Sequence, residues 1–342
     1  MRRTTATTQG QRGAAILLAM ITVVLVATLA SAALWQQWRA VEVEAAERTR
    51  AQSSWVLTGA LDWGRLILSE DGRKGGSDHL AEPWAMPLEQ ARLSTFLAAD
   101  RSDTLAADAS SNAFLSGKMV DLQSRLNLKN LVQDDGRLDP TALRMWERLF
   151  NYLGLQRAGL DRLVAQLPRT HKAGAPVLPD ASTNAANDGP LWPQEPDQLA
   201  WLGLDAQTLE QLRPYVTVLP ERTPVNLNTA PGPVLFAALE GLERADVQRL
   251  LGTRRLAPWE NLEDVKKAAK LPQLALDPLR VDTRTRFFGL LGTLQIDGNT
   301  TQEYSVVQRD ATAVKTLWRK RPLTPGTGPA FGTPAPTMND DF

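Results

Sequence analysis

The chain has 342 residues, of which 43% are hydrophobic and 22% are charged, a composition typical of a folded globular protein of about two domains. Lysine plus arginine equals aspartate plus glutamate at 38 each, so the chain has no overall field that would attract a phosphate backbone or an acidic surface. The absence of cysteine excludes a disulfide framework, cysteine-ligated zinc and thiol catalysis, and leaves the compartment undecided.

An uncharged run extends from Ala14 to Trp35, directly after a leader that contains Arg2, Arg3 and Arg12. A helix of this length spans about 33 Å, which is enough to cross the hydrocarbon core of a bilayer. The three arginines predict that the N-terminus stays in the cytoplasm and that the rest of the chain is translocated.

Three interpretations compete for this run. Ala30-Ser31-Ala32 offers a site for signal-peptide cleavage, and the run is also long enough for a plain single-pass anchor. The sequence after the run favours a third interpretation, a retained helix, because no proline occurs before Pro83 and apolar residues continue at helical spacing. We expect one helix to about Glu70–Gly72, half in lipid and half on a soluble core. Its apolar residues after the run are Trp38, Val41, Ala45, Trp55, Ala60, Trp63 and Ile67.

A basic leader ending in glycine and followed by such a helix resembles the precursors of type IV pilins and pseudopilins. The resemblance implies cleavage after Gly13 by a prepilin peptidase, with Ala14 becoming the N-methylated first residue of the mature protein. Most of that class carry a glutamate at the fifth mature position, where this chain has Leu18. Because an unpartnered carboxylate in hydrocarbon costs about 2.5–3.5 kcal/mol, the leucine favours a subunit with no neighbour ahead of it, at a filament tip.

The middle of the chain begins with strand patterns at residues 113–120 and 122–126, followed by a turn at residues 127–130. Residues 140–167 are helical in pattern, and Asp139-Pro140 provides a cap followed by a proline at the start. The core stripe expected for this helix consists of Leu143, Trp146, Leu149, Phe150, Leu153, Leu160 and Leu163.

A proline-, glycine- and asparagine-rich stretch at residues 168–197 predicts a long surface loop. Asn228 is expected to cap the second of the helices that follow, with Pro231 in its first turn. The helices are expected near residues 205–212, 231–239, 245–253 and 259–270.

Strand patterns return after Asp282, and three of them separated by short turns predict an antiparallel meander. We therefore predict an α+β class, a pilin-like fold with a long N-terminal helix packed on an antiparallel sheet and with an inserted all-helical domain. The expected divisions are a leader at 1–13, the helix at 14–70, the first part of the pilin-like domain at 71–132, the helical insert at 133–282, the C-terminal strands at 283–321 and a disordered tail at 322–342.

Three stretches carry a more specific resemblance: "DHLAEPWAMPL" at 78–88, "FLSGKMVDLQSRLNLKNLV" at 114–132 and "YVTVLPERTPVNLNTAPGPVLFAAL" at 215–239. They resemble the general secretion pathway protein K family, the large minor pseudopilins of bacterial type II secretion, over residues 13 to about 321. The resemblance implies an inner-membrane helix with a periplasmic head at the pseudopilus tip. It also implies assembly with minor pseudopilins of the I and J classes, facing the secreted cargo or the outer-membrane channel.

The helical block also has a rival interpretation, a membrane-anchored helix-hairpin-helix protein that binds DNA. Residues 225–255 begin with the valine-asparagine-threonine pattern of such modules and continue with paired short helices. The turn at 240–244, however, lacks the glycine-x-glycine hairpin whose amides face a phosphate. The basic residues of this block are better explained as solvated helix faces, so we expect no nucleic-acid partner. They are Arg249, Arg254, Arg255, Lys266, Lys267 and Lys270.

Catalysis and metal binding have little support in the sequence. The two histidines, His79 and His171, form no metal-spaced pair, and neither a phosphate loop nor a serine nucleophile elbow occurs, so we predict no enzyme, no catalytic residue and no cofactor. Family resemblance implies calcium in the helical domain, yet residues 163–192 contain only Asp180 and Asp188 as acids. Because calcium takes six to eight oxygen ligands, we assign no calcium ligands and leave the metal content open.

Overall fold

The computed structural model describes residues 12–93, 112–170 and 190–322. The chain divides into two compact units, Met1–Val56 and Leu57–Phe342, and helix α1 (Arg12–Lys74) contributes to both. Most of the leader, part of the loop expected at 168–197 and nearly all of the tail expected at 322–342 lie outside the described residues.

Helix α1 confirms the single long helix, which ends at Lys74 instead of Glu70–Gly72. Of the apolar residues expected to face the core in the second unit, Ile67 does pack against it and is partly buried, but Trp63 is 45% exposed. The buried face is formed by Leu57, Leu61 and Leu68 instead. Gly64 explains the difference. A Cβ added there would lie 2.9 Å from Leu290 Cδ2, so the helix approaches the sheet along a face of leucines and glycine that is too close for tryptophan.

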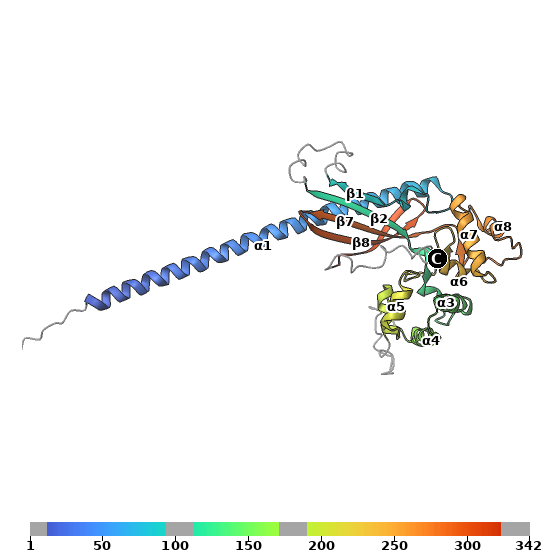
Figure 1. Ribbon diagram of the computed structural model, residues 1–342, viewed down its shortest axis with the longest axis horizontal. Helices are drawn as coiled ribbons and strands as arrows, with labels where there is room; N and C mark the ends of the chain where they lie inside the picture. Colours follow the sequence, from blue (N-terminus) through green and yellow to red (C-terminus); the bar gives the residue numbers. More distant parts are fainter. Residues whose placement is uncertain (1–11, 94–111, 171–189, 323–342) are drawn as a thin grey trace, which may run out of the picture. The chain divides into compact units, whose positions relative to one another are not determined.

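The sheet of the second unit has five antiparallel strands in the order β1-β2-β7-β8-β9 (Figure 1). The meander of the last three strands was predicted and is confirmed, with the turns made by residues at positive φ, Asp297, Gly298 and Ala311. Strand β1 was not predicted. The bounds are β1 Leu88–Arg92, β2 Ala113–Asp121, β7 Phe287–Ile296, β8 Asn299–Asp310 and β9 Ala313–Lys320.

The last turns of α1 share one hydrophobic cluster with the sheet. Leu61 and Leu68 pack with Phe288 and Leu290, and Trp84 meets Phe288 edge-on at 5.2 Å between ring centroids. Burial of these side chains holds the helix against the strands at about 1.5–3 kcal/mol for each fully buried residue.

A helical insert separates β2 from β7 in the sequence, as predicted (Figure 1). Its parts meet through two short parallel ladders, β3 with β4 and β5 with β6. The helices are α3 Pro140–Tyr152, α4 Arg157–Gln166, α5 Ala206–Leu212, α6 Gly232–Ala238, α7 Arg244–Leu256 and α8 Leu262–Ala269; the strands are β3 Leu126–Asn127, β4 Val216–Thr217, β5 Val225–Asn226 and β6 Val281–Asp282.

The insert has a hydrophobic core of its own, drawn from residues between Leu126 and Val281. Its largest fully buried side chain is Trp146, and Leu149, Phe150, Leu160 and Leu163 of the expected stripe are also buried. Leu143 and Leu153, the remaining members of that stripe, are partly buried against the same core.

Four local predictions in and beside the insert were wrong. The helix expected at residues 140–167 is two helices, because Gly154 adopts φ 68° and turns the chain between α3 and α4. The strand expected at residues 122–126 is mostly a 3₁₀ turn at Leu122–Ser124, and the turn at 127–130 is a 3₁₀ helix, Leu128–Leu131. Finally, Pro231 and not Asn228 is the N-cap of α6.

Candidate assembly helix and insert junction

The part of α1 in the first unit is an apolar helix with an open surface. Among the described residues, α1 is the one helix that is long and apolar enough to cross a membrane, and no residue of its most apolar stretch is buried. The large apolar side chains from Ile16 to Trp35 are between 56% and 67% exposed. A continuous apolar surface of this length in water is unfavourable, so lipid or other helices must cover it.

The residues expected to be processed lie at the start of this helix. Gly13 and Ala14 fall in its first turn, and cleavage between them stays a prediction. Leu18 is 67% exposed, and its carbonyl oxygen accepts a hydrogen bond from Thr22 Oγ1 at 2.7 Å. The threonine hydroxyl is therefore satisfied within the helix, and no charge occurs from Ala14 to Trp35.

A buried polar network joins the sheet to the insert, and no local sequence pattern predicted it. Asp121, at the end of β2, is 3% exposed and accepts hydrogen bonds from Thr285 Oγ1 at 2.6 Å, Thr229 Oγ1 at 2.5 Å and Asn226 Nδ2 at 2.9 Å. The Gln123 backbone amide donates a fourth bond at 2.7 Å. Burial raises the pKa of the Asp121 carboxyl to about 6, against the lowering effect of its hydrogen bonds.

Asparagines from two of the quoted stretches, residues 114–132 and 215–239, hydrogen-bond to backbone groups of the insert. The Asn130 side chain accepts a hydrogen bond from the Thr223 amide at 3.0 Å and donates one to the Thr223 carbonyl at 2.7 Å. The Asn228 side chain likewise accepts from the Trp259 amide at 2.9 Å and donates to the Trp259 carbonyl at 2.8 Å. Asn127 donates to the Glu221 carbonyl at 2.8 Å and accepts from the Leu219 amide at 3.1 Å. These side chains satisfy buried backbone groups where the chain forms no regular ladder, which explains the motifs structurally.

Asp139 confirms the helix start predicted from the sequence. Its Oδ1 accepts from the amides of Thr141 and Ala142 at 3.0 Å each, and its Oδ2 accepts from Arg222 at 2.6 Å and Arg280 at 2.5 Å. Burial acts to raise the pKa of this carboxyl, but the amides and the two guanidinium groups outweigh it and the pKa is lowered.

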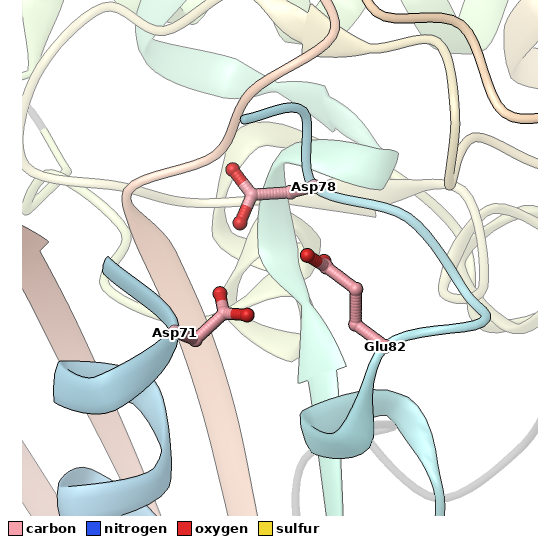
Figure 2. Close-up of side chains that lie close together, drawn as sticks. All are labelled: Asp71, Asp78 and Glu82. Carbon is pink, nitrogen blue, oxygen red and sulfur yellow. The ribbon is translucent and has the colours of Figure 1, made fainter. Parts of the chain in front are cut away.

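Three carboxylates converge where α1 ends. Figure 2 shows Asp71 from the last turns of α1, Asp78 from the following loop and Glu82 before a short 3₁₀ helix, with one oxygen of each within 4.8 Å of the others. Arg309 of β8 pairs with both Asp71, at 2.5 Å, and Asp78. Trp84 Nε1 donates to Glu82 at 2.7 Å. These ion pairs connect α1 to the sheet, and the Arg309 guanidinium already supplies a positive charge to the carboxylate cluster.

Burial also changes the acidity of this cluster. It raises the pKa of Glu82 to about 7, with hydrogen bonds from the His79 amide and Trp84 acting in the opposite direction. The pKa of Asp78 is raised by burial as well, although Arg309 and the Thr285 amide act to lower it. His79 lies in this loop, and its Nδ1 accepts a hydrogen bond from the Ala81 amide at 3.3 Å.

The basic residues that supported a DNA-binding interpretation are largely engaged within the insert. Arg254 is partly buried and donates to the carbonyls of Leu227 and Ala230 at 2.6 and 2.8 Å. Burial lowers the pKa of this guanidinium to about 10. Arg249, Lys266 and Lys267 pair with acidic residues of their own helices. A phosphate backbone would therefore have to compete with existing partners, and the geometry gives that interpretation no support.

The expected calcium region is only partly described. Asp180, Asp188 and His171 lie outside the described residues. Across residues 126–170 and 190–281, no three potential ligand side chains come together as a metal cluster. We therefore assign no calcium ligands, and the metal content stays open.

Comparisons with known proteins agree with the fold and the motifs. Two family models, both described as type II secretion system protein K, match residues 124–221 and 225–283. The second covers the segment that suggested a helix-hairpin-helix module. The type II secretion system protein K of Pseudomonas aeruginosa is 25% identical over 321 residues, 88% of this chain and 90% of the relative. That of Klebsiella pneumoniae is 27% identical over 284 residues, 78% and 80% of the two chains.

A solved structure has the same fold. The chain is similar to one in the crystal structure of the GspK-GspI-GspJ complex from the type II secretion system of enterotoxigenic Escherichia coli, with a TM-score of 0.60 and 18% identity. The match covers 81% of this chain and 100% of that one. The fold, with its long N-terminal helix, antiparallel sheet and helical insert, agrees with the family models. The chain therefore belongs to the type II secretion system protein K family of minor pseudopilins, as the family models and the relatives show.

Proposed function

We propose that this minor pseudopilin is cut after Gly13 and occupies the tip of a periplasmic pseudopilus, where it initiates assembly with minor pseudopilins of the I and J classes. The observation that carries the proposal is the exposed apolar length of α1, which has Leu18 where a carboxylate would pair with a preceding subunit. A solved complex of GspK with GspI and GspJ, whose first member has the fold of this chain, supports the choice of partners.

The apolar helix has two successive environments in this proposal. Before assembly it crosses the inner membrane, with the arginines of the leader on the cytoplasmic side. After assembly the same surface packs against the helices of neighbouring subunits. Because α1 has no charged side chain from Ala14 to Trp35, neither environment requires burial of an unpaired charged side chain.

The insert limits where the subunit can stand in a filament. It adds a second hydrophobic core, between Leu126 and Val281, to the pilin-like sheet. A head enlarged in this way hinders the stacking of a further subunit above it, whereas a position at the tip leaves it free to face secreted cargo or the outer-membrane channel. The buried network around Asp121 holds the insert on the sheet, as a fixed cap requires.

The proposal is tested by mixing the full chain in detergent with the I and J pseudopilins of the same system and measuring the mass of the product by light scattering. We expect a stable ternary complex at micromolar concentration. Replacing Leu17 and Val24 of α1 by serine should weaken it, whereas Leu279→Ser, a change at an 81% exposed leucine of the insert, should not. A chain that stays monomeric with both partners contradicts the proposal.

A further inference from the structure

The apolar run of α1 ends in an aromatic and cationic group. Trp35 and Trp38 are 61% and 62% exposed, and the guanidinium of Arg39 lies over the Trp35 ring at 5.4 Å from its centroid. Gln36 and Gln37 complete the first polar positions after the uncharged run. Tryptophan is enriched at the boundary between hydrocarbon and water, because its ring is apolar and its N–H needs a polar partner.

Arg39 differs from the arginines that follow it on the same helix. Arg48 pairs with Glu44 at 3.1 Å, and Arg50 pairs with Glu47 at 4.0 Å. Within the described part of the chain, no carboxylate lies within ion-pair distance of Arg39, which contacts only the face of an aromatic ring. Its guanidinium donors therefore remain available for an anion, and phosphate suits their planar, forked geometry.

The position of Arg39 along the helix matches the thickness of a bilayer. At 1.5 Å per residue, Arg12 and Arg39 are about 40 Å apart along the axis, close to the distance across a bilayer that includes its headgroups. Between them, Ala14 to Trp35 spans about 33 Å, close to the hydrocarbon core. The two tryptophans then fall at the outer edge of the core and Arg39 at the level of the outer phosphates.

We propose that Trp35, Trp38 and Arg39 form a phospholipid headgroup clamp. It sets the depth of the pseudopilin in the membrane before assembly, with Arg39 bound to a lipid phosphodiester and the two rings at the hydrocarbon boundary. This inference rests on the proposed membrane-inserted state of α1. It goes further by naming the residues that fix the periplasmic boundary and the lipid group that they bind.

The absence of native cysteine allows a depth measurement on the full chain. Single variants Ala33→Cys, Ala40→Cys and Val43→Cys are labelled with an NBD fluorophore and reconstituted in vesicles of phosphatidylcholine and phosphatidylglycerol. Dithionite added outside then reports which labels reach water. We expect protection at residue 33 and rapid quenching at residues 40 and 43, and an edge at any other place overturns the proposal.

The role of the clamp is tested in a Trp35→Leu, Trp38→Leu and Arg39→Gln background, which keeps good helix-forming residues. We expect the protected edge to move outward by about one helical turn, so that residue 40 becomes protected. The matched control, Arg48→Gln with Arg50→Gln, removes two cations that are paired within the helix and should leave the edge in place. An unmoved edge in the triple variant overturns the clamp while leaving the anchor intact.

Two further outcomes separate the alternatives. Water access at residue 33 in the unmodified background means that α1 is not inserted, which contradicts the membrane-anchored state and the clamp together. Displacement of the edge by added inorganic phosphate means that Arg39 prefers a free anion to a lipid headgroup, which also overturns the clamp. The ternary complex with I and J class partners, measured in detergent, is independent of both outcomes.

Discussion

Asp139 allows the helix cap and the buried ion pair of the insert to be tested separately. In Asp139→Asn the side chain keeps an oxygen for the amides of Thr141 and Ala142, and asparagine caps helices as well as aspartate does. The charge that Arg222 and Arg280 share is lost. Asp139→Ala removes both functions, so the difference between the two variants measures the cap alone.

The expected magnitudes follow from burial. The Asp139 side chain is 2% exposed, but Arg280 and Arg222 are 16% and 33% exposed, so water screens part of the loss. Breaking a fully buried pair costs about 3–5 kcal/mol, and we expect about 2–4 kcal/mol for Asp139→Asn. Asp139→Ala should lose about 1 kcal/mol more. Both values are measured by urea unfolding of residues 57–342 followed by circular dichroism.

The lowered pKa of Asp139 gives this prediction a second test. A carboxyl whose pKa is lower in the folded state contributes its stability above the unfolded pKa and loses it as pH falls through the folded one. The gap between the parent fragment and Asp139→Asn should therefore be constant near neutral pH and narrow below about pH 4. A gap under about 0.5 kcal/mol at neutral pH, or one that is the same at pH 7 and pH 3, refutes the reasoning.

Three other outcomes are expected. Leu18→Glu should make insertion of the precursor less favourable by up to about 3 kcal/mol, so that carbonate extraction finds a smaller membrane-inserted fraction. Unchanged insertion contradicts the argument that an unpartnered carboxylate at this position is unfavourable. Arg309→Met should destabilise residues 57–342 by about 3–5 kcal/mol in thermal melts, because Asp71 and Asp78 lose their partner. Stability should recover at low pH as Asp78, whose pKa is raised by burial, becomes neutral, and Arg73→Met, at a 60% exposed side chain, is the control. Because the pKa of Asp121 is raised, this carboxyl stabilises the folded state most below its unfolded pKa, and its contribution falls by about 3 kcal/mol as pH rises from about 4 to 6. Asp121→Asn should lose this pH dependence, and retention of it would assign the effect to another group.

Local patterns predicted the elements that are set by neighbours in the sequence. Asp139-Pro140 fixed the start of α3 through hydrogen bonds to the next two amides, and alternating residues identified β7, β8 and β9. The break at Gly154 was missed because apolar residues continue at helical spacing on both sides, although the glycine was the available signal. Trp63 was assigned to the wrong face because hydrophobicity alone does not show how closely Gly64 brings α1 to the sheet.

The polar sites could not be predicted because their partners are distant in the sequence. Asp121 meets Thr285 across 164 residues, and Arg309 meets Asp78 across 231. Each of these residues alone has the pattern of an ordinary surface polar group, and only the fold shows that burial raises the pKa of the Asp121 and Asp78 carboxyls. By contrast, the roles predicted for Gly13, Ala14 and Leu18 come from the resemblance to pilin precursors, because they depend on position relative to the leader, and they stay predictions.

The central claim is that this minor pseudopilin keeps its apolar helix as a working part of the mature protein. The most direct test is the N-terminal sequence and intact mass of the protein from membranes of cells that carry a prepilin peptidase. Our account predicts that the mature chain starts at an N-methylated Ala14. A start at Ala33, after signal-peptide cleavage, or an uncut chain that begins at Met1 would contradict it.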